Sequence, residues 1–380
     1  MKSNQNWVLV GEIDNLKREL ATTGLKQFNL NGKKIAISYA NNEFGAISGV
    51  CNHVGGPLGK GRLAGEYVVC PWHYWKFHHR TGEGEPGYEE DTVPSYKIKI
   101  EGGELYVDLA SETKRKKKAH DPHPLARAVK RGDGAIRVVG ISTTGMDPAN
   151  PRYSTSEELM VYALERASTE LNVEVKILKL AEMKFRNCEG FYSKSAHACT
   201  WPCSITLMDP NDEMEKVYDA LVHWADVVLL ATPIRWGAAS SLYYKMAERL
   251  NCVQNQITLK ENVLIKNKVA GFVITGGQDN IQAVAGEALG FFAELGFIFP
   301  PFPYVAHSLG WSAENMERNV NYVADSNDLR EGTFGLLKRS VDLASQLIAS
   351  TGKEPKFEKG GRKARRLEPD RKELAYNNAD

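Results

Sequence analysis

Two short runs near the N-terminus each place a cysteine close to a histidine, and they constrain this chain most. Cys51-Asn-His53 is followed sixteen residues later by Cys70-Pro-Trp-His73. Two thiolates and two imidazoles suit a two-iron, two-sulfide cluster in which one iron takes sulfur and the other nitrogen. The same residue types also bind structural zinc, although zinc fingers usually carry a cysteine pair and then a histidine pair. The interleaved order favours iron and the transfer of single electrons.

The residues around these runs extend the pattern. They are Gly55, Gly56, Pro57 and Leu58 after the first run, and residues 72–77 and Thr81-Gly82-Glu83 around and after the second. Over about residues 6–110 the sequence resembles the Rieske ferredoxin family. The resemblance implies an all-β domain in which Cys51 and Cys70 bind one iron of a [2Fe-2S] cluster and His53 and His73 bind the other.

The resemblance also bears on the reduction potential of the cluster. Respiratory-chain members of the family carry an extra cysteine in each loop, joined as a disulfide, and a serine after the second histidine that hydrogen-bonds a sulfide. Here Gly56 and Trp72 lie near the cysteine positions, and Tyr74 and Trp75 follow His73. Because hydrogen bonds to the sulfides raise the potential, we expect a low-potential, ferredoxin-like centre.

Length and charge limit the kinds of protein this chain can be. With 380 residues, 42% of them hydrophobic, it is long enough for two or three domains of roughly 100 to 200 residues. A net charge of +1 supplies no field to attract nucleic acid or an anionic membrane. No apolar stretch approaches the roughly 20 residues that span a bilayer, and residues 1–11 lack a secretory pattern. We expect a cytoplasmic protein without membrane or nucleic-acid partners, and the six cysteines fit a reducing compartment.

Composition divides the chain into four parts. Residues 1–110 contain short β segments separated by the turns Asn31-Gly32 and Gly102-Gly103. The predicted strands are Trp7–Val10, Lys34–Tyr39, Phe44–Ile47, Tyr67–Val69, Tyr96–Ile100 and Leu105–Asp108. Residues 111–134 carry the basic run Lys114–Lys118 and several prolines and glycines, which predicts a solvated linker. Residues 351–380 form a second basic segment, a predicted tail.

Residues 135–350 alternate apolar runs with helical periodicity. The predicted strands are Ile136–Ile141, Val173–Leu178, Val227–Thr232, Val269–Thr275 and Tyr304–Ala306. The predicted helices are Ser156–Glu170, Asp212–Trp224, Ser241–Cys252, Gln282–Leu295 and Leu329–Ala349. This alternation predicts a doubly wound, parallel, five-stranded sheet with helices on both faces.

The loops that follow the strands of such a sheet are where ligands bind. The first loop starts at Ser142 and enters a helix through Arg152 and Ser154-Thr155-Ser156. Hydroxyls, an arginine and a helix N-terminus suit a single phosphate, and no Gly-x-Gly-x-x-Gly pattern indicates a dinucleotide. A simple helix cap, with Glu157 in the first turn, explains the same residues.

The loops after the third and fourth strands suit a flat aromatic ring, because small residues allow close backbone approach and an aromatic side chain can pack on the ring. They contain Pro233, Ile234, Arg235, Trp236 and Gly237, then Thr275, Gly276 and Gly277. Over about residues 135–300 the sequence resembles the flavodoxin-like NAD(P)H-dependent FMN reductases and the related iron-sulfur flavoproteins. The resemblance implies FMN, with its phosphate at Ser142, Arg152 and Ser154–Ser156 and its ring against these two loops. It also implies NAD(P)H as co-substrate and a homodimer or homotetramer.

Other candidate residues remain open at this point. Iron-sulfur flavoproteins carry four clustered cysteines for a second cluster, and Cys188, Cys199 and Cys203 lie in the corresponding region. Only His197 or the remote Cys252 could supply a fourth ligand, so free thiols are favoured. His307 ends a strand and is a candidate contact for flavin or substrate.

Together these features predict an NAD(P)H-linked oxidoreductase. FMN would exchange electrons with the Rieske cluster and serve a small-molecule or protein acceptor. In one alternative, a redox partner loads the cluster and FMN reduces a quinone, a nitro compound or a similar substrate. In another, the chain is a redox sensor and not an enzyme. The sequence singles out no catalytic residue.

Overall fold

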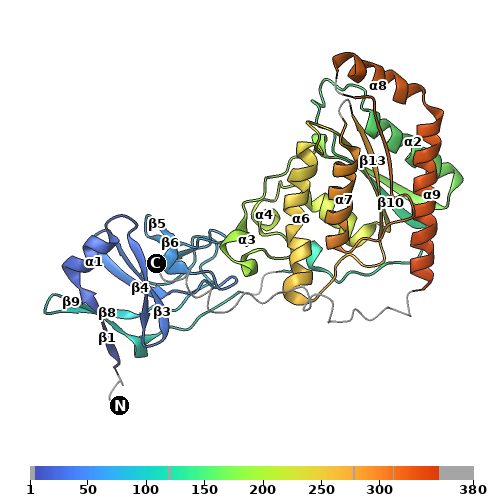
Figure 1. Cartoon of the computed structure of the whole chain (residues 1–380). Coiled ribbons are helices and arrows are strands. Elements are labelled where there is room, and N and C mark those ends of the chain that lie inside the picture. The colour runs from blue at the N-terminus through green and yellow to red at the C-terminus, as the bar shows by residue number, and fades with distance from the viewer. Residues whose placement is uncertain (1–4, 119–120, 277–278, 311, 351–380) are drawn as a thin grey trace, which may run out of the picture.

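The computed structural model describes residues 5–118, 121–276, 279–310 and 312–350. They form an N-terminal β domain and a C-terminal α/β domain, as the sequence predicts (Figure 1). Helix α3 (Phe191–Lys194) of the C-terminal domain lies on the side that faces the N-terminal domain. The two domains therefore meet through a segment inserted between strands of the second.

Three antiparallel sheets of three strands each build the N-terminal domain, in the orders β1-β9-β8, β2-β3-β4 and β5-β6-β7. The strands are β1 (Trp7–Glu12), β2 (Leu25–Leu30), β3 (Lys33–Ala40), β4 (Glu43–Ser48), β5 (Arg62–Ala64), β6 (Tyr67–Val69), β7 (Lys76–His78), β8 (Lys97–Glu101) and β9 (Glu104–Asp108). Helix α1 (Ile13–Leu20) packs Leu16 and Leu20 onto the core. The predicted ligands Cys51 and Cys70 belong to a second buried hydrophobic core around Phe77, so the two loops that carry them rest on a packed interior.

The C-terminal sheet is parallel and has the order β11-β10-β12-β13-β14. Its strands are β10 (Ile136–Ser142), β11 (Val173–Lys179), β12 (Val227–Pro233), β13 (Val269–Gly276) and β14 (Tyr304–Ser308). Successive residues of a strand point to opposite faces, and Val138 and Val139 accordingly enter two different cores. The predicted five-stranded doubly wound sheet is confirmed.

Helices cover both faces of this sheet (Figure 1). One face carries α5 (Met214–Tyr218), α6 (Ser241–Lys260) and α7 (Ile281–Leu295), and the other carries α2 (Thr155–Glu170) and α9 (Asn327–Ala349). The remaining helices are α3, α4 (Ser204–Met208) and α8 (Ala313–Asp325). Across the described ranges, no helix combines the length and apolar character needed to cross a membrane.

The predicted helix Asp212–Trp224 is confirmed from Met214 onward, but only Met214–Tyr218 is α-helical. The helix begins two residues later than predicted, and the Asp212 carboxylate before it forms a buried pair with Arg249. From Asp219 to Trp224 the chain is a π-helix, in which the Ala225 N–H donates to Ala220 O at 2.8 Å. Such wide turns occur where one extra residue must be fitted into a helix.

The described part of the linker is exposed along most of its length, but single residues near its two ends contact the domains. Lys117 Nζ donates to the carbonyl oxygen of His53 at 3.0 Å, and Arg115 donates to Val50 O at 3.0 Å. Further along, Leu125 is buried in the C-terminal core. Its carbonyl accepts a hydrogen bond from His223 Nε2 at 3.0 Å. The segment is therefore fixed to the first ligand loop at one end and to the α/β domain at the other.

Candidate iron-sulfur and flavin sites

The two ligand loops have the same backbone closure. The Cys51 N–H donates to Gly56 O at 2.8 Å, and the Cys70 N–H donates to Trp75 O at 2.8 Å. In the second loop Tyr74 has a φ of 61°, a left-handed conformation that few residues other than glycine adopt. Each loop is thus a tight turn that presents one cysteine and one histidine.

The four predicted ligands come together as two pairs, one of histidines and one of cysteines. The Nδ1 atoms of His53 and His73 lie 3.0 Å apart, and the thiols of Cys51 and Cys70 share a hydrogen bond. Burial lowers the pKa of His53 to about 4, helped by His73 and Lys117, so its imidazole is neutral at physiological pH. The hydrogen bond with Cys51 lowers the pKa of Cys70 to about 7. The same hydrogen bond, together with burial, raises the pKa of Cys51. A [2Fe-2S] cluster takes neutral imidazoles and thiolates, so binding iron must displace the proton of Cys51.

Close packing surrounds these donors. A Cβ atom on Gly56 would lie 2.7 Å from Cys70 Sγ and 3.2 Å from the Trp72 ring, so no larger residue fits there. The His53 ring stacks on Trp75, with centroids 4.9 Å apart and planes 3° from parallel. The cradle therefore has little freedom to accommodate a displaced ligand.

His73 also connects the two domains. Its Nε2 lies 2.7 Å from the carbonyl oxygen of Ala198, a residue of the C-terminal domain. Because a carbonyl oxygen only accepts, Nε2 carries the proton and Nδ1 is left free to bind iron. The ring of Phe191 meets the His73 ring edge-on, with centroids 5.1 Å apart. A candidate cluster ligand thus bonds directly to the α/β domain.

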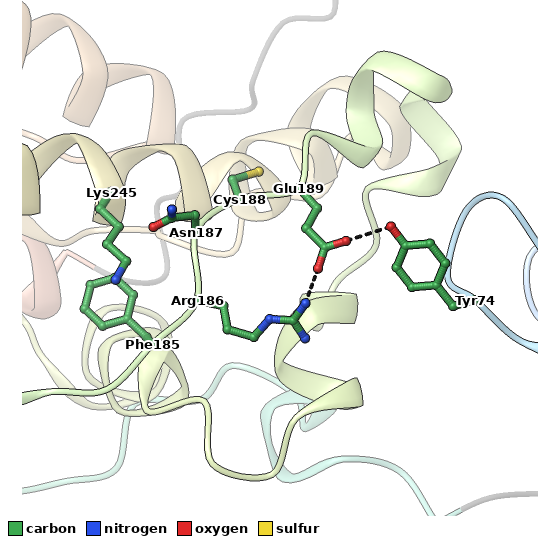
Figure 2. Close-up of a pocket in the computed structure, with 7 residues that line it drawn as sticks. All are labelled: Tyr74, Phe185, Arg186, Asn187, Cys188, Glu189 and Lys245. Carbon is green, nitrogen blue, oxygen red and sulfur yellow. Dashed lines mark hydrogen bonds and ion pairs between the residues drawn. The ribbon is translucent and has the colours of Figure 1, made fainter.

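Beside this contact lies an open pocket of about 710 Å³ at the domain junction (Figure 2). Figure 2 shows Tyr74 of the N-terminal domain pointing at Glu189, with a hydrogen bond of 2.9 Å from its hydroxyl to the carboxylate. Glu189 also pairs with Arg186. On the far side, the Lys245 ammonium of α6 lies over the Phe185 ring. The pocket thus reaches from the residue after a cluster ligand to the second turn of α6.

The predicted flavin loops lie together at the carboxyl edge of the sheet. The strand order reverses between β10 and β12, and a crevice at such a switch point is where doubly wound sheets bind ligands. There the Ser240 hydroxyl donates to Thr143 O at 2.6 Å, and the Ile234 N–H donates to Thr275 O at 2.8 Å. Thr143 and Ser240 were not among the predicted residues, although serine before a helical run is a recognisable cap.

Hydroxyl groups crowd the predicted phosphate site. The Ser142 hydroxyl donates to Glu157, Ser154 Oγ lies 2.8 Å from a threonine hydroxyl, and Thr155 Oγ1 lies 2.5 Å from Thr275 Oγ1. Arg152 is exposed. The Ser156 hydroxyl is buried and has no hydrogen-bond partner within the described part of the chain. Buried polar groups are normally paired, so this orphan fits a site completed by a phosphate oxygen.

We expect Ser156→Ala to weaken FMN binding by about fivefold, since one hydrogen bond contributes about 1 kcal/mol. The measurement is a fluorescence titration of flavin-free protein with FMN. Ser168→Ala is the matched control, because Ser168 lies on the same helix and its hydroxyl bonds only Glu165 O, at 2.7 Å. Unchanged affinity together with higher stability would show that the hydroxyl is merely unsatisfied.

The predicted ring loops differ in exposure. Pro233 and Ile234 are buried, whereas Arg235 is exposed and Trp236 is 90% exposed. Gly237 has a φ of +70°, and its carbonyl accepts from Asn280 Nδ2 at 2.5 Å. The two loops pack tightly, because a Cβ atom on Gly276 would lie 2.9 Å from the Ile234 side chain. Gly277 lies outside the described residues.

The other four cysteines are free thiols near α6. Cys203 and Cys252 share a hydrogen bond, Cys199 Sγ accepts from Asn251 Nδ2 at 3.4 Å, and Cys188 lines the junction pocket. Within residues that the structure describes, no group of three or more histidine, cysteine or acidic side chains is arranged around one metal ion.

His307 lies at the carboxyl end of β14, opposite Thr275 of β13. Its ring stacks on Tyr322 with centroids 4.4 Å apart, and its Nε2 is buried without a described partner. A flavin or substrate contact of His307 stays a prediction.

Comparison with known proteins assigns both halves. Residues 6–97 match the model of the Rieske [2Fe-2S] domain, and residues 148–312 match the NADPH-dependent FMN reductase. The p-cumate 2,3-dioxygenase system ferredoxin component of Pseudomonas putida is 34% identical over 82 residues, which are 21% of this chain and 70% of that protein.

Two further relatives match over shorter shares of their length. Human apoptosis-inducing factor 3 is 33% identical over 95 residues, 25% of this chain but 16% of that protein. The 8-demethyl-8-aminoriboflavin-5'-phosphate synthase of Streptomyces davaonensis is 32% identical over 88 residues, 23% of this chain and 32% of that protein. The chain belongs to the Rieske [2Fe-2S] family through its N-terminal domain, to which an NADPH-dependent FMN reductase domain is joined in the same polypeptide.

Proposed function

We propose that this chain is an NAD(P)H-linked flavin oxidoreductase in which FMN exchanges electrons with the Rieske cluster of the same chain. FMN bound in this domain would supply two-electron chemistry with the nicotinamide and one-electron chemistry with a [2Fe-2S] cluster. The hydrogen bond from His73 Nε2 to Ala198 O carries the proposal, because it joins a cluster ligand to the flavin domain.

Different residues of the chain would hold the cluster, the phosphate of FMN and the ring of FMN. The loops of Cys51 and Cys70 would hold the cluster in a buried cradle. The buried Ser156 hydroxyl and the start of α2 would receive the phosphate of FMN. The tightly packed backbone at Ile234 and Gly276 would take the edge of its ring. The 8-demethyl-8-aminoriboflavin-5'-phosphate synthase, a relative of the flavin half, agrees by its name with a riboflavin phosphate at this site.

Helix α6 connects the two sites. Its cap, Ser240, lies at the flavin loops, and Asn255 contacts the turn that meets His73. At 1.5 Å per residue, these two residues are about 22 Å apart along the helix axis. Since electron transfer slows steeply with distance, we expect the cluster to be reduced more slowly than the flavin.

Anaerobic stopped-flow mixing with NADPH, and separately with NADH, tests this proposal. We expect the flavin absorbance to bleach first and the cluster absorbance to follow in a slower phase. If neither nucleotide bleaches the flavin, while dithionite reduces both centres, the nicotinamide proposal fails. Electrons would then enter through the cluster, and FMN would reduce a quinone, a nitro compound or a similar acceptor.

The external acceptor is a small molecule or a protein. The Pseudomonas putida relative is by its name the ferredoxin component of a dioxygenase system, which supports an electron-transfer partner for this N-terminal domain. Steady-state turnover of NADPH with a one-electron acceptor such as ferricyanide would distinguish an enzyme from a redox sensor.

A further inference from the structure

The turn that meets the cluster ligand is short and is fixed from within. It is the 3-10 helix η5 (Ala196–Ala198), which begins at Ser195. The Ser195 hydroxyl accepts from the His197 N–H at 3.3 Å, and the Ala198 N–H donates to Ser195 O at 2.9 Å. Ala198 is fully buried. Its carbonyl oxygen, which accepts from the cluster ligand, therefore has a defined position.

Asn255 holds this turn from the flavin domain. Its side chain is fully buried on α6, and Nδ2 donates to Ala196 O at 2.8 Å and to Cys199 O at 2.7 Å. These two carbonyls flank that of Ala198 along the chain. The Asn255 Oδ1 accepts from the Thr258 hydroxyl at 3.2 Å, which sets the orientation of the amide. One side chain thus fixes the turn on both sides of the carbonyl that the ligand contacts.

A hydrogen bond from a ligand imidazole to a carbonyl makes the imidazole a stronger electron donor to its metal. A more basic ligand stabilises oxidised iron and lowers the reduction potential of the cluster. The bond from His73 Nε2 to Ala198 O is short, at 2.7 Å, and both residues are buried, so water does not compete for it. Any displacement of the turn would lengthen this bond.

We infer that Asn255 is a positioning residue for electron transfer between the domains. By fixing Ala198 O against His73 Nε2, it keeps the potential of the cluster low and holds the contact through which the electron passes. The inference rests on the proposed function. The step moves one electron from flavin that NAD(P)H has reduced to oxidised iron, forms and breaks no bond, and leaves the proton on Nε2.

Other contacts hold the domains together independently of Asn255. Lys194 Nζ donates to Pro71 O at 2.8 Å, and the Tyr74 hydroxyl donates to Glu189 at 2.9 Å (Figure 2). Neither contact involves the turn or its carbonyls. Loss of the Asn255 amide should therefore loosen the turn without separating the domains.

Asn255→Leu tests the inference, because leucine has a similar volume and no donor. We expect a higher midpoint potential of the cluster in a dithionite titration and shifted g-values in its EPR spectrum. After mixing with NADPH, cluster reduction should slow about tenfold or more, as expected for a misplaced contact, while flavin bleaching is unchanged. Iron and FMN contents establish that both sites are intact.

Two further variants sharpen the test. Asn251→Leu is the matched control, because Asn251 lies one turn earlier on α6 and, within the described chain, its amide donates to the sulfur of Cys199 and to no carbonyl of the turn. It should leave potential and spectrum unchanged. Ser195→Ala loosens the turn from its other end, at a partly exposed position, and should raise the potential less. If Asn255→Leu does not fold, the potential of Ser195→Ala tests the inference instead.

An unchanged potential and EPR spectrum in a fully loaded Asn255→Leu protein would overturn the inference. So would a shift of equal size in Asn251→Leu. The dithionite titration needs no nucleotide, so failure of NAD(P)H to bleach the flavin would count against the proposed function alone.

Discussion

Gly56→Ala is expected to abolish cluster binding while leaving FMN in place. The added Cβ would lie 2.7 Å from Cys70 Sγ, closer than two such atoms can approach. In the free protein this thiol could rotate away, but a sulfur bound to iron is fixed. Iron and sulfide analysis after anaerobic reconstitution should therefore fall from about two irons per chain to near zero, with the FMN content of the wild type.

Val54→Ala is the control for this change. Val54 lies in the same loop, is 37% exposed and belongs to none of the buried cores of the described chain. We expect it to keep its full iron content. Two irons per chain in Gly56→Ala, with the spectrum of the wild type, would show that the loops are more pliable than their packing indicates.

Arg249→Met is expected to destabilise the C-terminal domain by about 3–5 kcal/mol, the usual result of removing one partner of a buried ion pair. The side chains of Arg249 and Asp212 are both fully buried, with Arg249 Nη2 2.6 Å from Asp212 Oδ2. Arg249 also donates to Arg186 O and Thr206 Oγ1, each at 2.8 Å. It thereby fastens the inserted segment that faces the N-terminal domain, and its loss leaves a buried carboxylate unpaired.

Thermal unfolding followed by flavin release measures this effect, because two domains need not unfold together. Lys216→Met removes the exposed pair with Glu213 and should cost less than about 1 kcal/mol. Burial alone would raise the pKa of Asp212, but hydrogen bonds from Arg249 and Arg186 lower it below its ordinary value. The stabilisation by the pair is therefore present at neutral pH and is lost as the pH falls through this lowered pKa. Equal losses in the two variants would contradict a special role for the buried pair.

Local pattern was sufficient to predict the architecture. Strands β12 and β13 are buried at every position. Their sequences are therefore continuous apolar runs, the pattern expected of strands in a parallel sheet covered on both faces. Strand β2 was missed because its sequence, LKQFNL, buries only its first and last residues and shows no alternation. Helix α8 was missed because its face is largely polar and only Asn319 and Val323 are buried.

The candidate sites likewise contain residues that the sequence indicated and contacts that it did not. The four predicted cluster ligands are close in sequence and carry unusual chemistry, so their spacing was enough to single them out, and the structure places the two histidines side by side. The contact between His73 and Ala198 joins residues 125 positions apart, and one partner is a backbone carbonyl that any residue supplies. Asn255 lies three residues beyond the predicted helix Ser241–Cys252, in the part of α6 that the sequence did not predict. Only tertiary packing reveals what its amide holds.

The way the linker is fixed at both ends changes how strong the contact between the domains needs to be. Lys117 anchors one end at His53, and Leu125 anchors the other in the α/β core. Two surfaces tied together by so short a tether meet at an effective concentration on the order of millimolar. A handful of hydrogen bonds, too few for a lasting complex between separate proteins, is then enough to keep them engaged. The tether thus permits a contact between the domains that is weak and readily released.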